Sequence, residues 1–288
     1  MTATAKRRTR AFEQVESIAL RNDDVLNALR RFLHRAATRY LVWNRSLMLD
    51  PQLRYHPVVA LLNRRGTRIG DAILDIGSGS AGLAYFSGRP VVGVDVELSR
   101  EESRRVRSPI VPVRASAVSL PFRDRSFDVV VSMDTLEHLS PAARPDAVAE
   151  AFRVARSLVV LGFPYGEATA EFERDGLRDE RLYCAPTGWR DEHVRHGVPG
   201  RELHDVIAAI ASRLPGTRLQ WFGHEGLLGA RIRWKTRLLV PRGSRSYGLV
   251  FYPLYWIHMR GWRRRAYRRV YVATIEEPRS AEDVQRTA

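Results

Sequence analysis

The strongest constraint on the fold is a series of short apolar runs that alternate with segments of helical composition. The runs are Ala72–Ile76, Val91–Val96, Ile110–Val113, Phe127–Met133 and Leu158–Phe163. They are rich in valine and isoleucine and several are almost continuously apolar, as strands covered on both faces are. Residues 98–107 and 142–156 between them have helical composition. The alternation predicts an α/β fold with a doubly wound, mostly parallel sheet.

The sequence before this alternation predicts helices. Residues 1–10 have the composition of a disordered basic tail. Residues 11–66 have the composition of an N-terminal helical region. In the second half of that region, Val58, Leu61 and Leu62 recur at helical spacing. The core of the sheet is expected over residues 67–166.

The sequence after Pro164 has a weaker pattern. We expect residues 167–276 to hold loops on the side of the sheet where a substrate would lie, a last helix and two closing strands, with a basic insertion at 231–269 and a tail at 277–288. Within this part, 165–198 has the composition of polar loops with short helices. The helix is predicted at Glu202–Leu214, and the strands at Thr217–Phe222 and Val270–Ile275.

A glycine-rich turn follows the first apolar run and opens a helix. It reads Ile73-Leu74-Asp75-Ile76-Gly77-Ser78-Gly79-Ser80-Ala81-Gly82. Gly77 and Gly79 permit a tight turn and let a ligand approach the backbone, and the helix start offers free N–H groups. The pattern alone is weak, because enzymes that bind nicotinamide dinucleotides share it.

Two carboxylates narrow this choice. Asp75 stands two residues before Gly77, where it would repel a pyrophosphate but suits a cationic amino acid head group. Asp95 ends the next run, Val91–Asp95, where a carboxylate can accept hydrogen bonds from two ribose hydroxyls. Either residue could instead cap a turn or simply end a strand.

Two later segments complete a recognisable order of motifs. They are Ala115-Ser116-Ala117-Val118-Ser119-Leu120-Pro121-Phe122 and Ser126-Phe127-Asp128-Val129-Val130-Val131-Ser132-Met133-Asp134-Thr135-Leu136-Glu137-His138-Leu139. Together with the glycine-rich turn and Asp95, they resemble the class I S-adenosylmethionine-dependent methyltransferases, in the branch that contains quinone, natural-product and glycan-cluster enzymes. The resemblance covers residues 72–165 and implies a Rossmann-like seven-stranded sheet with S-adenosyl-L-methionine as cofactor.

The resemblance also implies which residues bind the cofactor. Those expected around its methionine part are Asp75, Gly77, Ser78, Gly79 and Met133. Those expected around its nucleoside are Asp95 at the ribose and Val96, Ser116 and Ala117 at the adenine. Ser116 departs from the family, which often has aspartate there, and the usual Pro-Gly-Gly turn is missing between Arg153 and Leu158.

Two histidines are candidates for a general base that would accept the proton of a hydroxyl acceptor. His138 follows the fourth predicted strand at the carboxyl edge of the sheet, where the acceptor should lie, and His193 stands in a loop that resembles acceptor-side loops. Each could instead have a local packing or capping role. Asp191, Glu192, His193 and His196 raise the question of a metal site, but no separate ligand cluster supports one, and we expect no metal.

The charge is uneven along the chain. The net charge is +15, and residues 231–269 carry lysines and arginines but no acidic residue. Within them, the aromatic and basic stretch 247–269 suits an anionic membrane surface, although a packed insertion or, less favoured, nucleic-acid binding through Trp262 and Tyr267 would also explain it. The single cysteine, Cys184, and the lack of a long apolar run predict a cytoplasmic protein, with peripheral binding at the inner membrane face as an option.

The sequence therefore predicts a methyltransferase that acts on a small-molecule, glycan or lipid acceptor. The Asn/Asp-Pro-Pro-Tyr motif of many amino-group methyltransferases is absent after the fourth strand, where Ser132-Met133-Asp134-Thr135 stands. Oxygen or carbon is thus the favoured acceptor atom. The alternatives are an RNA methyltransferase and a non-catalytic protein that binds S-adenosylmethionine.

Overall fold

The computed structural model describes residues 49–66, 71–98, 108–182, 188–239 and 266–276. Its contacts divide the chain into two units, Met1–Leu49 and Asp50–Ala288, and the fold described here is that of the second. The tails expected at 1–10 and 277–288, and most of the helix expected over 98–107, lie outside the described residues. Among these residues, no helix has the length and apolar character needed to cross a bilayer.

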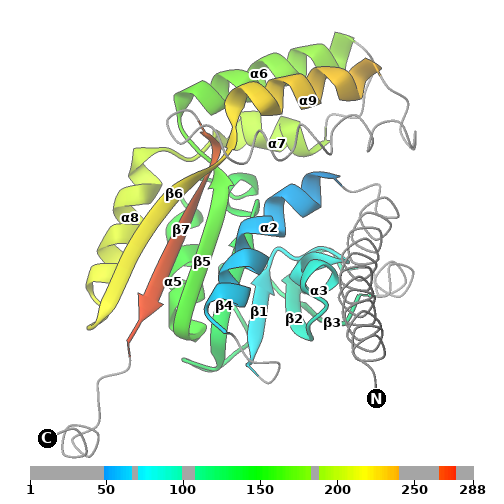
Figure 1. Ribbon diagram of the computed structural model, residues 1–288. Helices are drawn as coiled ribbons and strands as arrows, with labels where there is room; N and C mark the ends of the chain where they lie inside the picture. Colours follow the sequence, from blue (N-terminus) through cyan, green and yellow to red (C-terminus); the bar gives the residue numbers. More distant parts are fainter. Residues whose placement is uncertain (1–48, 67–70, 99–107, 183–187, 240–265, 277–288) are drawn as a thin grey trace, which may run out of the picture. The chain divides into compact units, whose positions relative to one another are not determined.

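A seven-stranded sheet in the order β3-β2-β1-β4-β5-β7-β6 forms the centre of this unit (Figure 1). Its strands are β1 Ile73–Ile76, β2 Val91–Asp95, β3 Ile110–Arg114, β4 Phe127–Met133, β5 Ala155–Pro164, β6 Thr217–Gly226 and β7 Ala266–Ile275. The first five run parallel, and β7 pairs antiparallel with both β5 and β6. This confirms the mostly parallel Rossmann-like sheet and each of the predicted strands.

Two hydrophobic layers, one on each face, explain the continuous apolar runs. Along β4, Val130 packs in the layer that includes helices α5 (Arg144–Val154) and α8 (Arg201–Ser212). Its neighbours Val129 and Val131 pack in the opposite layer, which includes α2 (Leu49–Arg64) and α3 (Gly82–Ser87). Because successive side chains of a strand point to opposite faces, a strand covered on both sides needs apolar residues at every position.

Three further helices lie beyond the carboxyl ends of the parallel strands (Figure 1). They are α6 (Glu167–Leu182), α7 (Gly188–His196) and α9 (Leu227–Leu239). The expectation of polar loops over 165–198 was wrong for α6, a 16-residue helix. Its buried positions include Glu173 and Glu180, and this inward-facing charge hides the apolar periodicity that reveals a helix.

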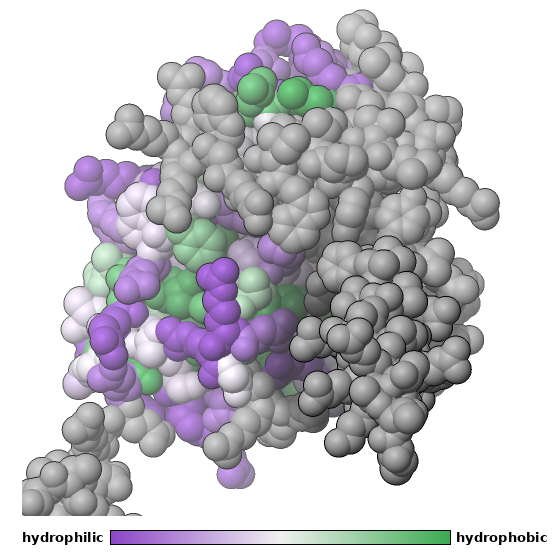
Figure 2. Space-filling view, viewed as in Figure 1, coloured by the Kyte–Doolittle hydropathy of each residue, from purple (hydrophilic) through white to green (hydrophobic). Residues whose placement is uncertain are grey.

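The end of the chain also differs from the sequence-based expectation. Strand β7 begins at Ala266, so that Arg268 and Arg269, expected in the basic insertion, belong to the sheet. Residues 240–265 of that insertion lie outside the described part. Helices α6 and α9 line a groove of about 510 Å³, and Leu228 and Ile232 of α9 are exposed. Figure 2 shows apolar side chains at the top of the molecule, where Figure 1 draws α6 and α9.

Candidate functional site

The glycine-rich turn between β1 and α3 is fixed by its backbone. The N–H groups of Gly77 and Ser78 donate to the carbonyl oxygen of Val94 on β2, at 2.7 and 3.2 Å. Gly77 has φ +73° and Gly79 has φ +55°, a backbone conformation that residues other than glycine rarely adopt. A Cβ on Gly77 would also collide with the side chain of Thr135, whereas one on Gly79 would meet open space. The turn therefore packs at Gly77 against the segment after β4, whereas the space beside Gly79 is open to a ligand.

Asp75 lies fully buried beneath this turn. Its Oδ2 accepts hydrogen bonds from the N–H of Leu83, at 2.7 Å, and from the hydroxyl of Tyr55, at 2.9 Å. Its Oδ1 has no hydrogen-bond partner among the described residues. Burial raises the pKa of this carboxyl to about 7, so a cationic group at Oδ1 would stabilise its charged form.

Asp95 ends β2 on the other side of the turn. Its Oδ2 accepts from the N–H of Gly79, at 2.9 Å, and its Oδ1 from the N–H of Glu97, at 3.1 Å. A carboxylate offers about four acceptor positions, so both oxygens can still accept ribose hydroxyls. The next side chain, Val96, is 56% exposed and offers an apolar surface to a planar ring.

The remaining predicted cofactor residues fall into two places. The N–H of Ala115 donates to the backbone oxygen of Asp95, at 3.2 Å, which sets Ser116 and Ala117 beside the end of β2. Met133, in contrast, is fully buried, and its side chain lies against Gly162 on β5. Met133 is thus part of the core, and its position beside the cofactor stays a prediction.

Asp134 is held by two arginines at the end of β4. Arg268 donates to its Oδ1 through Nε and to its Oδ2 through Nη2, both at 2.5 Å. Arg54 of α2 donates to Oδ2 at 3.1 Å. Although burial opposes ionisation, these two cations bring the pKa of Asp134 down to about 2. The Asp134 carboxylate thus serves as a charged anchor between β4, α2 and β7.

The two candidate histidines meet just beyond this anchor. His138 ends the short 3₁₀ helix η1 (Leu136–His138), and His193 lies on α7. Their Nε2 atoms are 3.3 Å apart. The Nδ1 of His138 lies 2.6 Å from Oε2 of Glu192, and the Nδ1 of His193 lies 3.6 Å from Oε2 of Glu173.

The pKa values of the two rings move in opposite directions. Burial, followed by the nearby His193, lowers the pKa of His138. Burial also acts to lower the pKa of His193, but the carboxylates of Glu173 and Glu137 outweigh it and raise that pKa. Glu137 is itself fully buried, and burial raises its pKa to about 7. His138 is therefore the neutral ring of the pair at neutral pH.

Comparison with known proteins shows which protein family the sequence of this site matches. Residues 74–161 match the family model described as a methyltransferase domain, and they include the turn, Asp95 and the end of β4. Residues 74–161 thus form a methyltransferase domain of the S-adenosylmethionine-dependent kind. S-adenosyl-L-methionine is the cofactor of domains of this family.

Individual relatives are distant. An uncharacterized protein of Haemophilus influenzae is 32% identical over 94 residues, which are 30% of this chain and 38% of that protein. The structure of magnesium protoporphyrin IX methyltransferase from Synechocystis, with bound SAH, is 13% identical with a TM-score of 0.50 over 83% of this chain and 95% of that one. A possible histamine N-methyltransferase from Thermotoga maritima is 14% identical with a TM-score of 0.47, over 85% and 97%. The likeness to the Synechocystis structure supports the fold alone.

The residues present fit the cofactor of this methyltransferase domain. The buried Oδ1 of Asp75 without a partner suits an amino group, and the open space above Gly79 admits a ligand against the backbone. Asp95 retains acceptor positions for hydroxyls, and Val96 is exposed beside it. The individual contacts of these residues with the cofactor stay predictions.

Sequence reasoning missed most of the polar cluster around the histidines. Its buried members include Glu137, Glu173, Arg190, Glu225 and Arg268. The spacing of Asp134, Glu137 and His138 in one short segment was the available signal, because three polar residues directly after a buried strand meet at one edge of the sheet.

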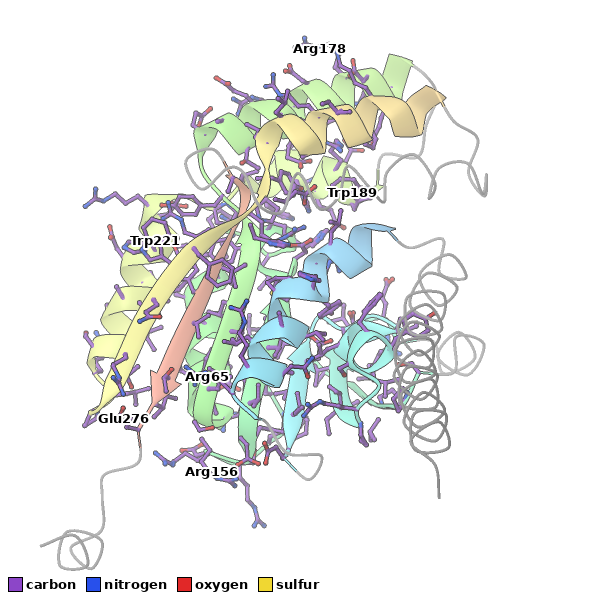
Figure 3. The ribbon with its side chains drawn as sticks, viewed as in Figure 1. Arg65, Arg156, Arg178, Trp189, Trp221 and Glu276 are labelled. Carbon is purple, nitrogen blue, oxygen red and sulfur yellow. The ribbon has the colours of Figure 1, made fainter. Side chains whose placement is uncertain are left out.

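The structure also corrects part of the basic stretch. Arg268 is 4% and Tyr267 is 6% exposed, and the hydroxyl of Tyr267 donates to Oε1 of Glu173 at 2.7 Å. Neither residue is placed to bind a membrane or to stack on a nucleic-acid base. The guanidinium of Arg269 lies 3.4 Å from the ring centre of Tyr165 and 4.1 Å from that of Trp221, which is labelled in Figure 3.

Proposed function

We propose that this methyltransferase transfers a methyl group to an oxygen atom of a small-molecule, glycan or lipid acceptor that binds beside η1 and α7. The observation that carries the proposal is the meeting of His138 and His193 at the carboxyl edge of the sheet. Thr135, three residues before His138, donates to the carbonyl oxygen of Ile76 at 3.1 Å and lies against Gly77. The histidine pair is thereby tied to the turn that holds the cofactor.

Two features favour oxygen over nitrogen as the acceptor atom. The position directly after β4, which in many amino-group methyltransferases holds a polar side chain toward the amine, is taken by Asp134, and both of its carboxylate oxygens accept hydrogen bonds from Arg268. An amine that arrives there would have to compete with Arg268 and Arg54 for this carboxylate. A hydroxyl, in contrast, needs a group that weakens its O–H bond, which the imidazole pair can provide.

The division of labour follows from these positions. The cofactor supplies a methyl group on a positively charged sulfur, which leaves as a neutral thioether. Glu192 orients the ring of His138, and the ring of Trp189, which Figure 3 labels on α7, packs against that of His193 with the ring centres 5.0 Å apart. Holding acceptor and methyl carbon in line contributes about 7–11 kcal/mol to such a reaction.

The test is transfer of isotopically labelled methyl groups to fractionated quinone, sugar, lipid and RNA extracts. We expect a labelled product in a quinone, sugar or lipid fraction, with a methyl ether in its mass spectrum. Label in RNA alone, or in no fraction while the cofactor binds, would refute the proposal. His138→Gln should reduce transfer about 10²–10⁴-fold, whereas His196→Gln on the same helix as His193 should leave it unchanged.

A further inference from the structure

We propose that Glu137, His138 and His193 bind one divalent transition-metal ion on the acceptor side of the site. One ligand atom from each residue lies within 4.8 Å of the other two. The proposal departs from the expectation that no metal is bound. It rests on the proposed function for the role of the ion, but the binding of the ion stands on the geometry alone.

The distances suit a metal ion between the rings. Bonds of about 2.0–2.1 Å from zinc to imidazole at a tetrahedral angle place two nitrogens roughly 3.3–3.4 Å apart. The two Nε2 atoms are 3.3 Å apart. Oε1 of Glu137 lies 3.8 Å from Nε2 of His193, so a small movement of this side chain completes the third position.

The carboxylates behind the rings fix which nitrogens face each other. Glu192 lies at Nδ1 of His138, at 2.6 Å, and Glu173 at Nδ1 of His193, at 3.6 Å. The short contact with Glu192 keeps the proton on Nδ1 of His138 and leaves the lone pair on its Nε2, which is how histidine ligands of metals are held. Glu173 lies beyond hydrogen-bond distance of Nδ1 of His193, so a bound ion and a single proton shared between the two Nε2 atoms are the two arrangements that bring these atoms to 3.3 Å.

Glu137 supplies the second, independent indication. Its side chain is fully buried, and neither of its oxygens has a hydrogen-bond partner among the described residues. In the same part of the chain, no lysine or arginine forms an ion pair with it, whereas Asp134 is held by Arg54 and Arg268. The cation nearest to this buried carboxylate is the ring of His193, 3.8 Å from Oε1 and not hydrogen-bonded to it, so its burial is costly and a bound metal ion lowers that cost.

The ligand chemistry defines the class of ion. Two imidazole nitrogens and one carboxylate are typical of zinc and other first-row divalent ions, whereas calcium and magnesium prefer oxygen ligands. A three-residue site leaves a position open for an acceptor hydroxyl, whose pKa the ion lowers. With the ion bound, the two imidazoles act on the hydroxyl through the ion and not as a base: the hydroxyl proton leaves to water, the O–CH₃ bond forms, and the S–CH₃ bond breaks.

The experiment uses the full chain after treatment with a chelator. Titration with Zn²⁺ by calorimetry and with Co²⁺ by visible absorption should give one bound ion per chain. His193→Gln and Glu137→Gln should each weaken binding at least 100-fold, Glu192→Gln about 10–100-fold, and His196→Gln not at all. Glutamine preserves the size of Glu137, and circular dichroism reports whether each variant is folded.

The possible results distinguish a bound ion from a proton shared by the two histidines, and they test the ion separately from the proposed function. No binding of either ion to the unmodified chain, or undiminished binding in both His193→Gln and Glu137→Gln, overturns the proposal. Affinity of the chelated chain for S-adenosylhomocysteine is measured in parallel, because it does not depend on the ion. Methyl transfer that persists in chelator would overturn the role of the ion while leaving the proposed function intact.

Discussion

The buried arginine of β7 should control the stability of this end of the sheet. Arg268 donates twice to Asp134, at 2.5 Å, and once to Glu225, at 3.2 Å, and its side chain is 5% exposed. Breaking a buried ion pair by removing one partner costs about 3–5 kcal/mol, since it leaves a buried charge uncompensated. Arg54 still reaches Asp134 at 3.1 Å. We therefore expect Arg268→Met to lower the free energy of unfolding by roughly 3 kcal/mol at pH 7, at the low end of this range.

The loss should depend on pH in a defined direction. The arginines lower the pKa of Asp134 to about 2, so its contribution is present above the unfolded pKa of about 3.9 and is lost as the pH falls toward 2. In Arg268→Met this pKa rises, and that of Glu225, already raised to about 7 by burial, rises further. Protonation of these two carboxyls removes the uncompensated charge from the variant. The difference in the free energy of unfolding between the variant and the unmodified chain should therefore become smaller as the pH falls from 7 to 4.5.

Urea denaturation followed by circular dichroism measures both effects. The matched control is Arg269→Met, which removes the neighbouring arginine from its stacking on Tyr165 and Trp221 and should cost about 1 kcal/mol. Addition of Asp134→Asn to Arg268→Met should recover part of the loss, because the uncompensated charge is then gone. A cost for Arg268→Met no larger than that of the control, or a deficit that does not change with pH, would refute the reasoning.

Three further predictions concern the turn, its acidic partner and the buried glutamate. Gly77→Ala should destabilise the fold by at least about 1 kcal/mol more than Gly79→Ala in thermal unfolding, because both incur left-handed strain but only the first collides with Thr135; equal losses would contradict this. Asp95→Asn should weaken S-adenosylhomocysteine binding at least tenfold in calorimetry without altering the melting temperature by more than a few degrees, and unchanged affinity would exclude its role at the ribose. Glu137→Gln should stabilise the chelator-treated chain by about 1–3 kcal/mol at pH 8 but hardly at pH 4.5. The pKa of Glu137 is raised to about 7, so the cost of its burial grows as the pH rises from 4.5 through 7, and an equal effect at both pH values would count against it.

The central sheet could be predicted from the sequence because its physical signal is local. A strand such as β4, which is covered on both faces, must be apolar at consecutive positions, and that requirement is visible in the run Phe127–Met133. The turn was equally visible, since Gly77 and Gly79 have positive φ angles that glycine adopts without strain. These elements need no information from distant parts of the chain.

The polar cluster could not be predicted in the same way, because its residues are distant in sequence. His138 and His193 are 55 positions apart, and Asp134 and Arg268 are 134 positions apart. In addition, α6 turns Glu173 inward, which reverses the usual pattern of apolar residues on the buried face. Sequence reasoning therefore named both histidines as candidates but could not place them in contact with each other.

Asp75 and Glu137 indicate how the two halves of the site divide their ligands. Both carboxyls are fully buried, both have an oxygen without a hydrogen-bond partner among the described residues, and burial raises both pKa values to about 7. Thr135 connects their surroundings, because it touches Gly77 of the turn over Asp75 and directly precedes η1, which contains Glu137. Each carboxyl would gain from a cation of its own, which we predict to be the amino group of the cofactor for Asp75 and propose to be a metal ion for Glu137. The ligand-free chain should therefore lose stability as the pH rises through 7, and each cation should restore a separate part of that loss, because the charge it compensates lies on a different side of Thr135.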